Sequence, residues 1–264
     1  LANNRIVDVG DADVLITNVR QSGLARLGLD ASTLLERHPR LVYGAISGFG
    51  FAGPDADKAA YDIAGFWARS GIADALTAPT APHPPFQRGG MGDHTAGQSL
   101  AGGVAAALFQ RERSGKGTMV HTSLLANGVW SASCLVQAQL ANADFSAMFG
   151  TRLTGALFET SDHRWLQLTM MRTDEDFDRF LVVMEMFEIL ASGKFSTLEQ
   201  RFLHAEELTQ LLRDQLRTRT AQEWLNLLRD EHDLPIELVS EFRELNENPH
   251  LELNNMIAPP VDDI

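Results

Sequence analysis

One carboxylate, Asp93, stands where a glycine-rich turn meets a long apolar segment. The turn spans residues 89–92, and apolar residues follow it at helical spacing, namely Leu100, Val104 and Leu108. A carboxylate at a helix N-terminus meets unpaired backbone N–H groups and the positive end of the helix dipole. It could therefore act as a nucleophile, with donors beside it that could hold an oxyanion. Asp is also among the best N-cap residues, and the local sequence by itself favours a simple cap.

The elements that must position Asp93 alternate between strands and helices. Three short apolar runs predict strands, at residues 13–18, 41–47 and 118–123. Helical spacing marks residues 31–37, 59–70, the long segment after Asp93, and 124–140, which we expect to be a buried helix. Prolines predict an irregular loop over residues 77–85. This alternation is typical of a parallel sheet with covering helices.

The pattern changes near residues 142–150. Residues 155–160 and 164–169 resemble the two strands of an antiparallel hairpin. Helical spacing then dominates, at residues 174–190, 204–217 and 221–231, with Thr220 as a cap before Glu223. The predicted fold class is therefore α/β, with a Rossmann-like parallel-sheet large domain over residues 1–145 and a smaller α+β domain over residues 146–264.

Composition excludes several classes of function. A net charge of −13 over 264 residues argues against nucleic-acid binding. The single cysteine, Cys134, cannot form an intramolecular disulfide, which fits a reducing compartment, and its apolar surroundings predict a small core residue. No apolar run has membrane-spanning length, and neither a Met nor a signal peptide opens the chain, so we expect a cytoplasmic protein without membrane contact. The abrupt ends, Leu1 and residues 259–264, predict that the chain is part of a longer one.

Several segments, in this order and spacing, resemble the family III CoA-transferases. This is the family of formyl-CoA and carnitine-CoA transferases, whose fold is shared by α-methylacyl-CoA racemases. The resemblance rests on residues 12–18, 23–28, 39–50, Gly53-Pro54, Tyr61-Asp62, Gly92-Asp93 and 111–117, and it continues more loosely through residues 235–249. It implies a fragment of the family III fold, because members are usually longer at both ends. Residues 1–145 would then belong to the large CoA-binding domain, and residues 146–264 would form the smaller domain and the start of a return linker.

The resemblance also implies a role for Asp93. In the transferases the Asp of this Gly-Asp motif attacks an acyl-CoA thioester and forms an aspartyl-acyl anhydride, which CoA thiolate converts to an aspartyl-CoA thioester. Covalent catalysis of this kind divides the exchange of one carboxylate for another into steps of comparable energy. The glycines of the turn would let the thioester approach the backbone, and they serve equally well in a tight turn.

Tyr61 separates the two activities of this fold. The racemases carry a His at this position, which works with the Gly-Asp carboxylate as an acid–base pair. A further acid of the racemases would fall near Arg172. Both departures argue against racemase activity, whereas the transferases have a Tyr here that contacts CoA. From the residues alone, Tyr61 fits equally a surface position on an amphipathic helix.

The remaining CoA contacts that the resemblance implies are Asn18, Arg26 and Gly92. Arg26 corresponds to an arginine that lies along CoA, and Asn18 ends a strand where open α/β sheets bind ligands. Without the resemblance, Arg26 could equally be a solvated surface charge, and Asn18 could be a turn residue. The eight histidines show no metal-ligand spacing, so no metal site is predicted. His94 diverges from Asp93 on a helix and is only a supporting candidate. Residues 148–155 lack the glycine run that shields the intermediate in one transferase subgroup.

The sequence thus predicts an acyl-CoA:carboxylate CoA-transferase with Asp93 as nucleophile. Coenzyme A would be a cosubstrate, with no tightly bound cofactor, and the partners would be an acyl-CoA, a carboxylic acid and a second copy of the chain in an interlocked homodimer. Two alternatives remain open, a 2-methylacyl-CoA racemase and a non-catalytic CoA-binding subunit. The sequence does not identify the acyl donor or the acceptor acid.

Overall fold

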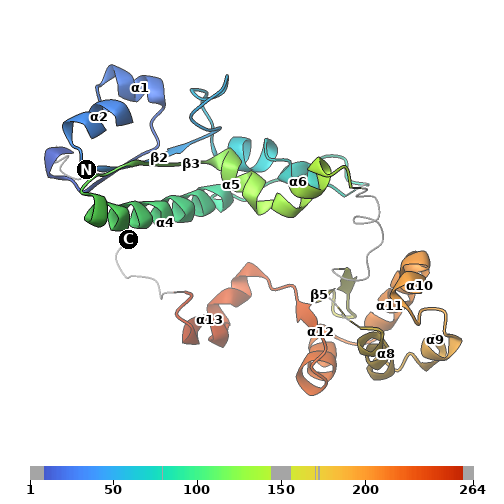
Figure 1. Cartoon of the computed structure of the whole chain (residues 1–264). Helices are drawn as coiled ribbons and strands as arrows, with labels where there is room; N and C mark the ends of the chain where they lie inside the picture. Colours follow the sequence, from blue (N-terminus) through green and yellow to red (C-terminus); the bar gives the residue numbers. More distant parts are fainter. Residues whose placement is uncertain (1–8, 79, 144–155, 170, 172, 258–264) are drawn as a thin grey trace. The chain divides into compact units, whose positions relative to one another are not determined.

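The chain divides into two compact units, Leu1–Ala143 and Asp144–Ile264 (Figure 1). The computed structural model describes residues 9–78, 80–143, 156–169, 171 and 173–257. Each unit has an apolar core and a sheet of its own. The first unit carries Asp93 and the elements that position it.

A three-stranded parallel sheet forms the centre of the first unit. Its strands are β1 (Val14–Thr17), β2 (Val42–Ser47) and β3 (Met119–Ser123), in the order β1-β2-β3. In the register, Leu15 pairs with Tyr43 and Ala45 pairs with His121. The three predicted strands and their parallel arrangement are confirmed. A short helix, η1 (Val9–Asp11), precedes β1.

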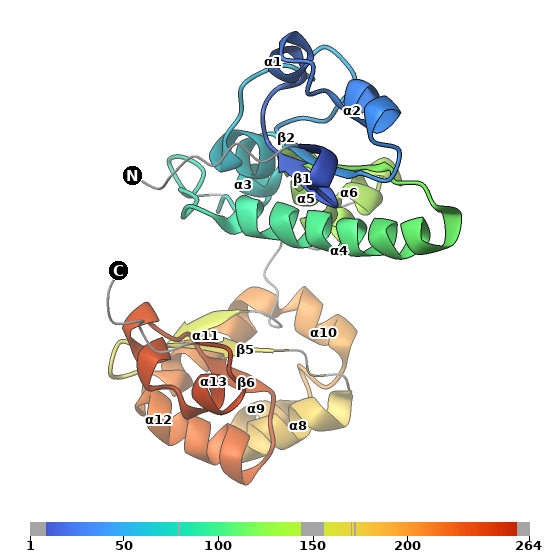
Figure 2. The same ribbon diagram turned by 90° about the vertical axis from the view of Figure 1, so that its left-hand side faces the viewer.

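Helices cover both faces of this sheet. The helices α1 (Gln21–Arg26) and α2 (Ala31–Arg37) lie on one side and the long helix α4 (Met91–Ser114) lies on the other (Figures 1 and 2). Along β2, Tyr43 packs in a cluster with Leu34 of α2, whereas its neighbour Val42 packs with Leu100 of α4. This alternation follows from the two-residue period of a strand, and apolar residues on both faces are typical of a parallel sheet.

Helix α4 begins two residues before Asp93. Its N-cap is Gly90, which has a φ of 87°, a left-handed conformation that glycine adopts without strain. Asp93 is therefore the third residue of the helix, and its interpretation as a simple N-cap is wrong. Toward the other end of α4, the buried guanidinium of Arg111 donates to Asp13 Oδ1 at 2.8 Å and to the Arg40 carbonyl at 3.3 Å. The C-terminal part of the helix is thus held by groups outside it.

Among its described residues, the first unit contains four further short helices, namely η2 (Ile63–Ala68, a π-helix), α3 (Ile72–Ala75), α5 (Leu124–Ser131) and α6 (Ser133–Leu140). The buried helix expected over residues 124–140 is wrong in two respects. It is broken at Ala132, and its apolar residues Trp130 and Leu140 are 77% and 73% exposed. Cys134 is exposed as well, so it is not a core residue. Apolar composition predicts a tendency to be covered, but it does not say which surface provides the cover.

The second unit contains an antiparallel sheet. Strands β4 (Leu157–Glu159), β5 (Trp165–Leu168) and β6 (Ile236–Leu238) lie in the order β4-β5-β6. The predicted hairpin is confirmed for its described residues, and β6 joins it from a segment that periodicity did not identify as a strand. The helices that the structure describes in this unit are α8 (Asp174–Val183), α9 (Phe187–Ser192), α10 (Leu198–Leu203), α11 (Ala205–Leu216), α12 (Ala221–Trp224), η3 (Leu225–Glu231), η4 (Phe242–Glu247) and α13 (Pro249–Leu253).

The core of the second unit surrounds Trp224, Phe158 and Phe180, each fully buried. Thr220 and Glu223 form the capping box expected at the start of α12. The single helix expected over residues 174–190 is instead two, α8 and α9, because the chain turns between them at Glu185, which has a φ of 59°. A left-handed residue of this kind ends a helix.

Candidate active site

A cavity of about 480 Å³ lies at the edge of the parallel sheet where the three strands end. Its lining includes residues that follow β1, the last residues of β2, the segment before η2, the first turn of α4 and the first residue of α5. Among them are Asn18, Arg20, Ser47, Tyr61, Asp93 and Leu124. Ligands of open α/β sheets bind at the carboxyl ends of the strands. Three residues selected from the sequence, Asn18, Tyr61 and Asp93, therefore lie around one cavity.

Asp93 presents its carboxylate to solvent from the first turn of α4. The first backbone N–H groups of a helix have no partners within the helix, and their dipoles favour negative charge nearby. An oxyanion that forms beside Asp93 would meet the same favourable field. The position therefore supplies accessibility for a nucleophile together with electrostatic support for its reaction.

Gly92 lies below the cavity lining rather than in it. It is buried, and its N–H donates to Asp62 Oδ1 at 3.0 Å. A Cβ at this position would lie 2.3 Å from the same Oδ1 and 2.3 Å from Phe66 Cβ, so no larger residue fits without displacement. The glycine is thus required for close approach of the Asp62 carboxylate to the start of α4. A direct contact between Gly92 and CoA stays a prediction.

Two arginines follow the first strand, and only one of them lines the cavity. Arg20 lines it, whereas Arg26 ends α1, is exposed and is not part of the lining. Both arginines act on the carboxylate of Asp57. Hydrogen bonds from Ser22 are the main cause that lowers the pKa of Asp57, and the positive charges of Arg20 and Arg26 lower it further. Sequence reasoning selected Arg26 but missed Arg20. The signal for Arg20 was its place directly after the first strand, two residues beyond Asn18.

The remaining sequence candidates lie outside this cavity or outside the described residues. His94 is exposed, and its ring packs against the helix-starting turn, where a Cβ on Gly90 would lie 3.1 Å from His94 Cε1. Its supporting role stays a prediction. Arg172 and the segment 148–155 are not among the described residues.

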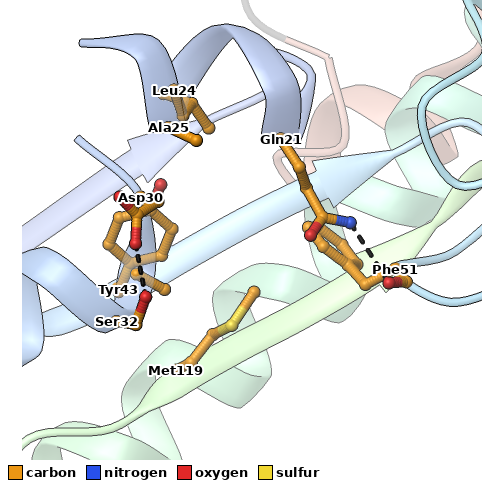
Figure 3. A pocket seen from close by; sticks show the side chains of 9 residues that line it. Gln21, Leu24, Ala25, Asp30, Ser32, Tyr43, Phe51 and Met119 are labelled. Atoms are coloured by element: carbon orange, nitrogen blue, oxygen red, sulfur yellow. Dashed lines mark hydrogen bonds between the residues drawn. The ribbon is translucent and has the colours of Figure 1, made fainter. Parts of the chain in front are cut away.

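A second cavity, of about 400 Å³, lies between the α1–α2 side and the sheet (Figure 3). Gln21, Leu24, Tyr43, Phe51 and Met119 line it, and Gln21 Nε2 donates to the Phe51 carbonyl at 3.2 Å. Asp30 stands at its rim and caps α2, where its Oδ1 accepts the N–H of Thr33 at 3.0 Å. None of the residues selected from the sequence as CoA contacts lines this cavity.

The Asp30 cap predicts a pH dependence of stability. Hydrogen bonds from Ser32 and Thr33 lower the pKa of Asp30 from 3.8 to about 2. Because the folded-state pKa lies below the unfolded value, the carboxylate stabilises the fold above pH 3.8 and loses that contribution as the pH falls toward 2. The melting temperature of the parent should therefore exceed that of Asp30→Ala at pH 6, and the difference should shrink below about pH 4. A difference that is constant down to pH 3 would contradict this assignment.

In the part of the chain that the structure describes, no group of three or more His, Cys, Asp or Glu side chains is arranged to hold a metal ion. Among the same residues, no helix combines the length and the apolar character needed to cross a membrane.

The first unit thus combines a parallel α/β fold with a cavity and an exposed carboxylate, that of Asp93, at the carboxyl edge of its sheet. Over residues 9–262 the chain matches the family described as CoA-transferase family III, and it belongs to that family. The resemblance inferred from the sequence is therefore confirmed. The crystal structure of Rv3272 from Mycobacterium tuberculosis has the same fold, with a TM-score of 0.80 at 22% identity over 96% of this chain and 70% of that one.

The relatives with named activities include CoA-transferases and a racemase. A cinnamoyl-CoA:phenyllactate CoA-transferase of Clostridium sporogenes is 30% identical over 255 residues, which are 94% of this chain and 61% of that protein. An alpha-methylacyl-CoA racemase of Mus musculus is 32% identical over 130 residues, which are 48% of this chain and 33% of that protein. The chain thus spans about three fifths of the length of the transferase that it resembles.

Proposed function

We propose that the protein transfers coenzyme A between an acyl-CoA thioester and a free carboxylic acid, with Asp93 as the nucleophile. The observation that carries this proposal is the exposed Asp93 carboxylate in a cavity that Asn18 and Tyr61 also line. Family membership supports the choice of coenzyme A as the transferred group. The protein would need no tightly bound cofactor, because coenzyme A itself is a cosubstrate.

The reaction would proceed through two kinds of aspartyl intermediate. An Asp93 oxygen attacks the thioester carbonyl, the C–S bond breaks, and CoA thiolate leaves behind a mixed anhydride. The thiolate attacks the aspartyl carbonyl of this anhydride, which releases the first carboxylate and forms an aspartyl-CoA thioester. The acceptor carboxylate displaces CoA to form a second anhydride, and thiolate attack on its acyl carbonyl restores Asp93. No proton or water is consumed.

The surrounding residues would serve binding and charge stabilisation. The helix N-terminus at Asp93 would stabilise the oxyanion of each tetrahedral intermediate. Arg20 would attract the acceptor carboxylate or a phosphate of CoA, and Asn18, Arg26, Tyr61 and Gly92 would contact CoA. We further propose a cytoplasmic, interlocked homodimer. The exposed Trp130 and Leu140 offer apolar surface that such an interface could cover.

Substrate exchange tests this function directly. The purified protein is incubated with acetyl-CoA, succinyl-CoA or cinnamoyl-CoA and a panel of carboxylic acids, and the CoA esters are followed by mass spectrometry. We expect at least one new CoA ester that depends on the protein. Binding of CoA esters without any exchange would instead favour a non-catalytic CoA-binding subunit.

The racemase alternative predicts a different observable. The partial match to a racemase keeps it open, but Tyr61 stands where the racemases need a His for proton transfer. We therefore expect no exchange of the α-proton of a 2-methylacyl-CoA in deuterated water above the rate without protein, as measured by mass spectrometry. Deuterium uptake that is lost in Asp93→Ala would assign the protein to the racemases.

A further inference from the structure

A buried carboxylate, Asp62, lies directly behind the cavity. It is 7% exposed, although its neighbour Tyr61 is 84% exposed and lines the cavity. Its Oδ1 accepts two hydrogen bonds, from the N–H of Gly92 at 3.0 Å and from Nε2 of Gln87 at 2.9 Å. The reaction proposed above assigns no role to Asp62. Removing a carboxylate from water costs free energy that hydrogen bonds from the surroundings must offset. The burial of Asp62 therefore needs an explanation.

The N-terminus of helix α4 has no side-chain cap from its own N-cap residue. Its N-cap residue is Gly90, which has no side chain with which to accept a hydrogen bond. The first N–H groups of a helix need acceptors from elsewhere, and a negative group is favoured there by the helix dipole. Asp62 provides this acceptor from 30 residues earlier in the chain, at the N–H of the residue that precedes Asp93.

Gly92 and Gln87 both support the contact between Asp62 and the start of α4. Gly92 provides the space, since a Cβ there would lie 2.3 Å from Asp62 Oδ1. Gln87, which is 3% exposed, holds the same oxygen from the loop that leads into α4. Asp62 Oδ2 and Gln87 Oε1 are also buried, and neither has a hydrogen-bond partner among the described residues. Burying two such oxygens costs free energy, so the arrangement needs a structural or functional explanation.

We propose that Asp62 is a positioning residue that fixes Tyr61 and Asp93 relative to each other. Tyr61 precedes Asp62 in the chain, and Asp93 follows Gly92. The hydrogen bond between the Asp62 carboxylate and the Gly92 N–H therefore links the two segments that carry these cavity residues. A nucleophile displaced by about 1 Å can lose about 100-fold in rate. This role rests on the proposed function for its effect on turnover, whereas the hydrogen bond itself can be tested without activity.

Two substitutions separate positioning from binding. We expect Asp62→Ala to lower kcat about 100-fold and to change KM for the acyl-CoA by less than about threefold, because Asp93 is misplaced while the proposed substrate contacts of Asn18, Arg20 and Arg26 do not depend on Asp62. Asp62→Asn keeps an oxygen that can accept the N–H of Gly92 and should stay within about threefold of the parent in kcat. Turnover is measured with the most active pair of the panel of acetyl-CoA, succinyl-CoA and cinnamoyl-CoA and their acceptor acids.

Hydrogen exchange provides the readout that is independent of activity. In the protein alone, peptides that cover residues 90–95 should exchange faster in Asp62→Ala and at the parent's rate in Asp62→Asn. The matched control is Asp162→Ala, because Asp162 Oδ1 caps a helix start in the second unit by accepting the N–H of Ala221 at 3.0 Å. This control should accelerate exchange at the start of α12 and leave kcat unchanged.

The outcomes distinguish the two proposals. Parent-like kcat and exchange in Asp62→Ala, an equal loss in Asp62→Asn, or a change confined to KM would overturn the positioning role. Parent-like turnover in Asp93→Ala would instead overturn the proposed function, and the exchange data would still decide whether Asp62 holds the helix. If Asp62→Ala does not fold, Gln87→Ala replaces it, with an expected loss in kcat of about 10-fold and parent-like turnover as the contradicting result.

Discussion

Asp93→Ala should lower the rate of CoA transfer by at least about 10³-fold, because removal of a nucleophile leaves only binding and electrostatic contributions. The fold should be retained, since the Asp93 side chain is exposed and α4 begins at Met91 without it. The rate is measured as formation of the new CoA ester under substrate saturation. Hydroxylamine added during turnover should convert Asp93 to a hydroxamate that peptide mass spectrometry identifies.

A matched control tests whether the loss is specific. Asp74 is also an exposed acid in the first turn of a helix of the first unit, in α3, but it does not line the cavity. Asp74→Ala should transfer CoA at the parent's rate and should show the same labelling at Asp93. Parent-like transfer by Asp93→Ala, or hydroxamate formation at another carboxylate, would refute the aspartyl mechanism.

Much of the first unit could be predicted because its signals are local. The strands at residues 14–17, 42–47 and 119–123 are apolar runs between turn residues, and helix 31–37 begins at a capping Asp. The start of α4 could not be predicted in the same way. Asp93 is a good cap by composition, but the glycine conformation at Gly90 and the carboxylate of Asp62 together start the helix two residues earlier.

The candidate site shows the same division between local and distant signals. Asp93 is indicated by its place at the start of a predicted helix, and the motif resemblance adds its role together with Asn18 and Tyr61. The structure places all three around one cavity. Asp62 belongs to one of the motifs that carry the resemblance, but nothing in the local sequence reveals that its carboxylate reaches Gly92. Likewise, the apolar composition of residues 124–140 predicts burial, although Trp130 is 77% exposed among the described residues. Contacts between distant segments and between surfaces leave little trace in a single sequence.

Two glycines of the same helix should respond to alanine in opposite ways. Gly92→Ala places a Cβ within 2.3 Å of both Asp62 Oδ1 and Phe66 Cβ, so either the helix start or η2 must shift. Overpacking of this kind costs about 1–3 kcal/mol of unfolding free energy. Because the shift occurs beside Asp93, we also expect at least about a 100-fold loss of CoA transfer.

Gly97 provides the control, since it is exposed in the interior of α4 and a Cβ there would have no atom within 4 Å apart from the adjacent backbone of its own helix. Ala is favoured over Gly in a helix by about 1 kcal/mol, so Gly97→Ala should raise the unfolding free energy and leave the transfer rate unchanged. Chemical denaturation followed by circular dichroism measures both changes in stability. If Gly92→Ala is as stable and active as Gly97→Ala, the close packing of Asp62 against α4 does not exist in solution. If Gly92→Ala loses activity but keeps the parent's stability, the predicted cost of overpacking is wrong, and only the sensitivity of Asp93 to small displacements is supported.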